Sequence, residues 1–222
     1  YHKWKNLIHG FEPMAANQLW AADITYIMLN NGDVCYLHLI TDAYSRMIVG
    51  WELADTLRAS ITIKALEQAI SQTGGVSLED LTHHSDRGVQ YCCDDYVRML
   101  QTHKIKISMT EDYNPTDNAI AERANGVIKT ETVYSRKTFN SLEHARNVIG
   151  RFIHFYNYRR PHMSIGYKIP AVVHTETGAQ KKMWKKKNYP KKAYNNGNNG
   201  ISLPCRTTGA DDGCNHHTVY SI

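Results

Sequence analysis

Three apolar segments rich in aromatic and β-branched residues follow one another between residues 20 and 53, a composition typical of β-strands. Asn30-Asn-Gly-Asp33 lies between the first two, and Asn-Gly between apolar strands favours a tight hairpin. A second turn is predicted over residues 41–46. The segment is therefore expected to form an antiparallel meander, with strands over residues 20–28, 34–40 and 47–53.

Helices and short strands alternate after this meander. Residues 59–73 place Ile63, Leu66 and Ile70 on one face, as an amphipathic helix does, and Gly74-Gly75 ends that helix. Further helices are predicted over residues 94–104 and 141–156 and in the segment that carries Glu122, which Thr116 or Asp117 can cap. Strands are predicted over residues 81–85 and 106–109. This order predicts an α/β fold, a mixed five-stranded sheet flanked by helices.

The pattern weakens after Pro161, and we divide the 222 residues into three parts. Residues 1–18 are a lead-in segment, residues 19–175 the core, and residues 176–222 a Lys-rich and Asn/Gly-rich tail that is expected to be flexible. No apolar run reaches the length of a membrane span. Five cysteines, an odd number with no Cys-x-x-Cys pair, favour a reducing, cytoplasmic setting over a disulfide framework. The chain does not begin with Met, so we expect a longer protein with a preceding module.

Charge is distributed unevenly along the chain. Residues 1–122 carry 9 Lys and Arg against 16 Asp and Glu, a net charge of −7, whereas residues 123–192 carry 16 against 3, a net charge of +13. An acidic site beside a basic half suits metal-dependent chemistry on a polyanion. A solvated basic surface would give the same counts.

Three carboxylates stand out by their positions. Asp23 lies within an apolar strand, Asp86 follows the fourth strand, and Glu122 lies on the helix after the fifth. Cleavage of a phosphodiester is assisted by two hard cations about 4 Å apart, which prefer oxygen ligands. Asp23 is the natural bridging ligand, flanked by the other two. Taken singly, Asp86 suits a turn and Glu122 an exposed helix face, so only the combination predicts a site.

Two basic residues lie on the same faces as these acids. His84 is two residues before Asp86, so in a strand it points to the same side, where contact with substrate and simple packing are both open. Lys129 lies seven residues after Glu122 on the same helical face, where it can meet a DNA phosphate or remain in solvent.

Four motifs occur in an order and spacing that resemble the integrase core of bacterial insertion-sequence transposases. They are Trp20-x-x-Asp23-Ile-Thr-Tyr26, His84-Ser-Asp86-Arg-Gly-x-Gln-Tyr91, Asp117-Asn-Ala-x-x-Glu122 and Tyr156-Asn-Tyr-Arg-Arg-Pro-His162. The resemblance covers roughly residues 11–175. These transposases are relatives of the retroviral integrases, in the ribonuclease H-like superfamily.

The resemblance implies an Asp-Asp-Glu triad, here Asp23, Asp86 and Glu122, that holds two Mg²⁺ or Mn²⁺ ions. It implies cleavage at the ends of a DNA element, strand transfer to target DNA by a 3′-hydroxyl, and a homo-oligomer on paired ends. A helix-turn-helix module usually precedes such a core. The protein would be cytoplasmic, associated with the bacterial nucleoid. Arg159 and Arg160 match the Arg-Arg-Pro-His segment and are candidate DNA contacts, with packing against the core as the other possibility.

Two further readings stay open from the residues alone. A ribonuclease H-like nuclease that only hydrolyses would use water as the nucleophile. A non-catalytic DNA-binding protein would retain the fold without the chemistry, although the presence of all three acids argues against it.

Overall fold

The predicted hairpin begins the sheet. In the computed structural model, which describes residues 4–111, 118–133 and 139–180, β1 (Leu19–Met28), β2 (Val34–Asp42) and β3 (Ile48–Ala54) form the expected antiparallel meander. Gly32 has a φ of 88° in the turn, a left-handed conformation that glycine adopts without strain. Strand β2 runs two residues further than predicted, because Thr41 and Asp42 still pair with β1.

The other two strands join the meander in parallel. β4 (Thr82–Ser85) pairs with the first residues of β1, and β5 (Lys106–Met109) pairs with β4. The strand order is β3-β2-β1-β4-β5. The prediction of a mixed five-stranded sheet is therefore confirmed, and the first strand lies beside the fourth as expected.

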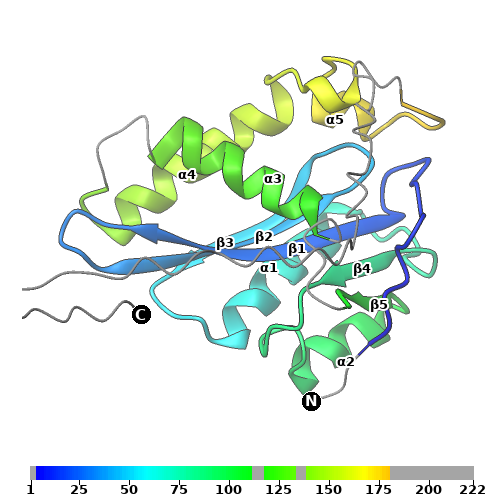
Figure 1. Cartoon of the computed structure of the whole chain (residues 1–222), viewed down its shortest axis with the longest axis horizontal. Helices are drawn as coiled ribbons and strands as arrows, with labels where there is room; N and C mark the ends of the chain where they lie inside the picture. The colour runs from blue at the N-terminus through cyan, green and yellow to red at the C-terminus, as the bar shows by residue number, and fades with distance from the viewer. Residues whose placement is uncertain (1–3, 112–117, 134–138, 181–222) are drawn as a thin grey trace, which may run out of the picture. The chain divides into compact units, whose positions relative to one another are not determined.

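Helices cover both faces of this sheet (Figure 1). α1 (Ala59–Gln72) and α2 (Asp94–Thr102) lie on one face, and α3 (Ala119–Ile128) and α4 (Leu142–Tyr158) lie on the other. Trp20 and Ala22 belong to the core on the α1 and α2 side, whereas Ile27 belongs to the core on the α4 side. This alternation along β1 is the period of two that a pleated strand imposes, and it turns Asp23 toward α3.

Local details at the helix ends differ from the sequence-based expectation. The N-cap of α3 is Asn118, whereas the predicted caps Thr116 and Asp117 lie outside the described residues. Ser141 caps α4, accepting a hydrogen bond of 3.1 Å from the backbone N–H of His144. Three short elements were not predicted: a π-helical turn η1 (Lys129–Val133), a 3₁₀ turn η2 (Met163–Ile165) and α5 (Pro170–Val173).

Segments at both ends of the described core hydrogen-bond to it and to each other. The N–H of Leu7 donates to Ser108 Oγ at 2.9 Å, and the N–H of Gly178 donates to the carbonyl of Met14 at 2.7 Å. The contacts of the core thus continue past residue 175. Residues 181–222, which make up most of the predicted tail, lie outside the described residues. No helix in the described part of the chain is long and apolar enough to cross a membrane.

Candidate active site

Asp23 lies where the sheet changes from antiparallel to parallel pairing. On one side β1 pairs with β2 along its whole length, with Asp23 opposite Leu39. On the other side β4 pairs only with Leu19, Trp20 and Ala21. Strand β4 ends at Ser85, and continuing its register with β1 by two residues brings Asp86 alongside Asp23. Neighbouring strands are about 4.8 Å apart, so this topology brings the two acids together.

Helix α3 is fixed above Asp23 by two asparagines. Asn118 Nδ2 donates to the carbonyl of Ala22 at 3.1 Å, and Asn125 Nδ2 donates to Asp23 Oδ2 at 2.6 Å. These asparagines are seven residues apart and therefore share one face of the helix. Glu122 lies four residues after the first and three before the second, so it is on the same face. It is exposed, which leaves its carboxylate open to solvent at this site.

The electrostatics of Asp23 link the three carboxylates. Burial raises the pKa of Asp23 to about 6, against the lowering effect of the hydrogen bonds from Asn125 and from the Ile24 backbone. The negative charges of Asp86 and Glu122 contribute smaller parts of this rise in the pKa of Asp23. Such a group holds its negative charge at a cost unless a cation is close. The donor set is made of carboxylate oxygens, which suits Mg²⁺ or Mn²⁺.

Asp86 is held in a turn at the end of β4. Its Oδ1 accepts a hydrogen bond of 2.9 Å from the N–H of Gly88, the turn role that its local sequence suggests. A Cβ at Gly88 would lie 2.9 Å from the same oxygen, so a larger residue there would displace the Asp86 carboxylate. Within residues 4–111, 118–133 and 139–180, no three His, Cys, Asp or Glu side chains converge closely enough to hold a metal ion as they stand. Asp86 and Glu122 are thus close enough to Asp23 to affect its pKa. The three carboxylates do not form a preformed metal-binding site.

Comparison with known proteins identifies the family of this chain. Residues 13–115 match one family model described as "Integrase core domain", and residues 103–170 match a second with the same description. The chain belongs to the integrase core family. Its relatives are encoded by bacterial insertion sequences.

The putative transposase of element IS986/IS6110 from Mycobacterium tuberculosis is 36% identical to this integrase core over 174 residues, which cover 77% of this chain and 62% of the relative. A 31 kDa protein of IS600 from Shigella sonnei is 38% identical over 162 residues, 72% of this chain and 58% of the relative. Transposase InsF of IS3A from Escherichia coli is 32% identical over 164 residues, 73% of this chain and 56% of the relative. The chain spans about three fifths of the length of these relatives.

Solved structures identify the fold of this chain. The catalytic core domain of HTLV-2 integrase, described in complex with magnesium, superposes with a TM-score of 0.58 and 20% identity, covering 73% of this chain and 99% of that one. A simian T-cell lymphotropic virus intasome chain gives a TM-score of 0.64 and 20% identity, covering 84% and 66%. At this identity the likeness concerns the fold alone, and the ribonuclease H-like fold expected from the sequence is confirmed.

The lysine and the two arginines predicted to contact DNA lie in surroundings that differ from one another. Lys129 begins η1, and its Nζ lies 4.2 Å from the centroid of the exposed Tyr26 ring on β1. Arg159 is exposed at the C-terminus of α4. Arg160 is paired with Glu131, with its Nε 3.1 Å from both carboxylate oxygens. Much of the charge of Arg160 is thus already neutralised within the protein.

The predicted role of His84 as a DNA contact does not agree with its position in the structure. Its side chain is 0% exposed, and its Nδ1 lies 2.9 Å from Ser108 Oγ on the neighbouring strand β5. A DNA strand cannot reach this ring while β4 and β5 are paired. Of the two roles that the sequence left open, the structure supports packing, and the prediction of a DNA contact by His84 is wrong for this conformation.

Sequence reasoning missed the residues that orient the site. Asn118 and Asn125 are 7% and 5% exposed, unusual for asparagine, and both tie α3 to β1. Their seven-residue spacing on the face of Glu122 was the available signal. It was not decisive, because an asparagine in a helix can equally face solvent.

Proposed function

We propose that this integrase core cleaves DNA strands at the ends of an insertion sequence and joins the resulting 3′-hydroxyl to target DNA. The observation that carries the proposal is the position of Asp23. It lies beyond the last residue that β4 covers, under a helix that carries Glu122 and is tied to it through Asn125. The kinship with transposases of insertion sequences supports DNA as the substrate.

In this proposal Asp23, Asp86 and Glu122 would hold two Mg²⁺ or Mn²⁺ ions. The magnesium in the HTLV-2 integrase core supports the choice of metal. When bound, such ions activate the attacking oxygen and stabilise the leaving oxygen of the phosphodiester. A cation would also offset the burial and, to a smaller extent, the repulsion from Asp86 and Glu122 that raise the pKa of Asp23.

The remaining residues of the site position these groups. The hydrogen bond from Asn125 to Asp23 Oδ2 holds the Asp23 carboxylate in one orientation. The Asp23 carboxylate would then be oriented to bind metal. Lys129 over Tyr26 lies along the part of β1 that β4 leaves uncovered, where a phosphate of incoming DNA would meet its charge. Arg159 is proposed as a further phosphate contact, and Arg160 as one only after exchange with Glu131.

We further propose that the protein acts as a homo-oligomer on paired DNA ends, on chromosomal DNA in the bacterial cytoplasm. The likeness to a chain of an intasome supports the assembly. Recognition of a particular end sequence would belong to parts of the relatives that this chain does not span.

The test is a strand-transfer assay with a labelled, pre-cut duplex and a supercoiled target, in Mg²⁺ or Mn²⁺ and in EDTA. We expect metal-dependent cleavage and joined product. Asp23→Asn, Asp86→Asn and Glu122→Gln should each lower both by about 100-fold or more, because each removes a ligand of the reacting centre.

The matched controls remove one acid each at exposed sites on other surfaces. They are Asp80→Asn before β4 and Glu67→Gln on α1, and both should retain activity. Unchanged cleavage in the three site variants would exclude the triad. Cleavage by the wild type without any joined product would instead favour the nuclease that only hydrolyses.

A further inference from the structure

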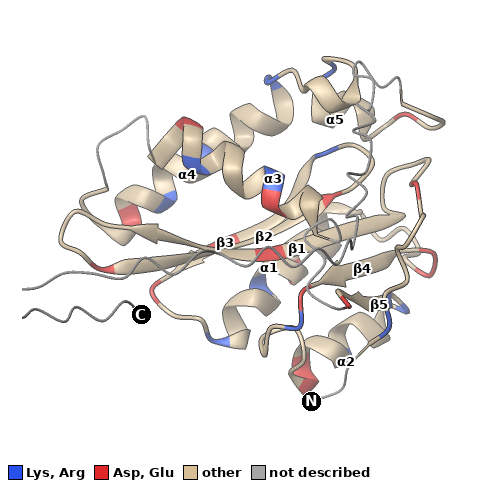
Figure 2. Ribbon diagram, viewed as in Figure 1, with Lys and Arg blue, Asp and Glu red and all other residues tan. Residues whose placement is uncertain are grey.

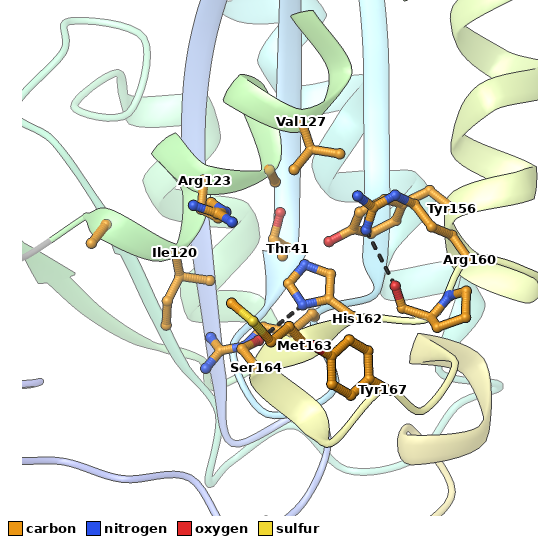
Figure 3. A pocket seen from close by; sticks show the side chains of 14 residues that line it. Thr41, Ile120, Arg123, Val127, Tyr156, Arg160, His162, Met163, Ser164 and Tyr167 are labelled. Atoms are coloured by element: carbon orange, nitrogen blue, oxygen red, sulfur yellow. Dashed lines mark hydrogen bonds between the residues drawn. The ribbon is translucent and has the colours of Figure 1, made fainter. Parts of the chain in front are cut away.

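A cleft of about 520 Å³ lies between α3 and the segment that follows α4. Ile120, Arg123 and Val127 line it from α3, and His162 and Tyr167 line it from the opposite side (Figure 3). The residues of α3 that contact β1 near Asp23 are different ones, so this cleft is separate from the carboxylate site. Its volume falls in the range of clefts that bind small molecules.

The cleft is positively charged. Arg46, Arg123 and Arg160 all line it, and no Asp or Glu among the described residues does. Of the three, only Arg160 forms an ion pair within the described residues, with Glu131. The pKa of His162 is lowered to about 4, mainly by burial and in part by the charges of the three arginines. Their positive fields therefore converge at one point of the wall, beside a histidine that is neutral at pH 7. In Figure 2, a basic position lies directly beside an acidic one on α3.

Arg46 is the residue with least compensation. It closes the turn after β2 with a left-handed φ of 67°, and its Nε and Nη1 are buried without a hydrogen-bond partner in the described part of the chain. Two buried guanidinium nitrogens without an acceptor are costly, and burial lowers the pKa of Arg46 against the opposing effects of Tyr156 and Asp42. An anion in the cleft would offset this cost by its charge.

The walls away from the arginines are apolar or aromatic. Ile120, Val127, Met163 and the rings of Tyr156 and Tyr167 line the cleft, and Met163 and Tyr167 are 45% and 58% exposed. Flat apolar walls beside a cationic end suit a ligand that combines an aromatic ring with an anion. A carboxylate side chain from another protein would satisfy the arginines but leave most of the apolar wall uncovered.

We propose that this cleft binds one nucleotide of a DNA strand that has left the base stack, with its phosphate toward Arg123 and Arg46 and its base against Ile120, Met163 and Tyr167. The proposal rests on the proposed function, which brings DNA to this face. Arg123 follows Glu122 directly in α3, so the cleft borders the place where the strand would be cut. It would hold an unpaired end beside the reacting centre, where extrusion of a base is less costly than within a duplex.

The test is equilibrium binding in EDTA at fixed salt, with two labelled duplexes of the same sequence. One is blunt, and the other ends in a short single-stranded extension. The wild type should prefer the extended duplex. Arg123→Gln should weaken binding of the extended duplex by about tenfold or more relative to the blunt one, as expected for a lost charge-assisted contact.

Two further variants separate the cleft from general charge. Met163→Trp fills the cleft without removing charge and should abolish the preference. Arg151→Gln removes an exposed charge on α4 that does not line the cleft, and it should weaken both duplexes alike, by about threefold or less. If Met163→Trp does not fold, Tyr167→Asn removes the ring instead and suits the left-handed backbone there, whose φ is 61°.

Equal losses for both duplexes in Arg123→Gln, or an unchanged preference in Met163→Trp, would overturn the proposal, as would absence of DNA binding by the wild type. A change in the sedimentation of Met163→Trp without a change in DNA preference would also overturn it and assign the cleft to a protein segment. Because binding is measured without metal, the two proposals fail separately. If the wild type prefers the extended duplex but does not cleave DNA in Mg²⁺, the proposed function is contradicted. If it cleaves DNA but binds both duplexes equally, only the role of the cleft is contradicted.

Discussion

Asp23→Asn should stabilise the metal-free protein while abolishing its activity. The pKa of Asp23 is raised from 3.8 to about 6, mainly by burial. One pKa unit corresponds to about 1.4 kcal/mol, so the ionised carboxylate costs the fold roughly 3 kcal/mol at neutral pH. Asp23 keeps some contact with water, and we therefore expect a gain of about 1–2 kcal/mol in the free energy of unfolding. For a chain of this size that raises Tm by roughly 2–8 °C.

The sign of the pH dependence follows from the direction of the shift. Because the folded pKa lies above the unfolded one, the unfolded state loses its proton first as pH rises. Asp23 therefore lowers stability progressively between about pH 4 and pH 6, and its cost is constant above that window. The advantage of Asp23→Asn should be full at pH 7.5 and about half as large at pH 5.

Urea denaturation in EDTA at these two pH values measures the effect, with Asp80→Asn as the control for loss of an exposed carboxylate. Added Mg²⁺ should stabilise the wild type and not the variant, since a ligand that binds only the folded state raises its stability. No gain at pH 7.5, or a gain that does not depend on pH, would refute the reasoning that burial and the two neighbouring acids strain Asp23.

Two further predictions concern positioning and packing. Asn125→Ala removes the 2.6 Å hydrogen bond that lowers the pKa of Asp23, so the acid limb of the pH–rate profile should move to higher pH and the cleavage rate should fall about tenfold; a lower rate with an unmoved profile would contradict this role. Gly50→Ala would place a Cβ 2.1 Å from the carbonyl oxygen of Ala65 on α1 and should cost about 1–3 kcal/mol in urea denaturation. Gly126→Ala, where a Cβ meets nothing within 4 Å, should instead stabilise α3 by about 0.5–1 kcal/mol, and equal effects at the two glycines would contradict the packing argument.

The linear pattern of residues determined the elements and their order. Aromatic and β-branched runs, Asn-Gly and paired glycines act within a few residues of chain, so the meander, the parallel strands and the main helices were predictable within a few residues. The short turns η1 and η2 were not, because such turns depend on contacts after the helix rather than on local propensity. The places of the three acids, within the first strand, after the fourth and on the helix after the fifth, were also predictable, because they are local properties; their joint role as a metal site stays a prediction.

What the acids and arginines do together was decided by the tertiary structure. The sequence predicts that His84 and Asp86 point to the same side, yet His84 is fully buried beside Ser108 of β5 while Asp86 is exposed. The pairing of β4 with β5 ends at Ser85 and does not reach Asp86. The tie from Asn125 to Asp23 spans 102 residues, and the cleft draws Arg46, Arg123 and Arg160 from three separate segments. No local pattern encodes such distances. They follow from how α3 and the end of α4 pack on one face of the sheet, near the turn that follows β2.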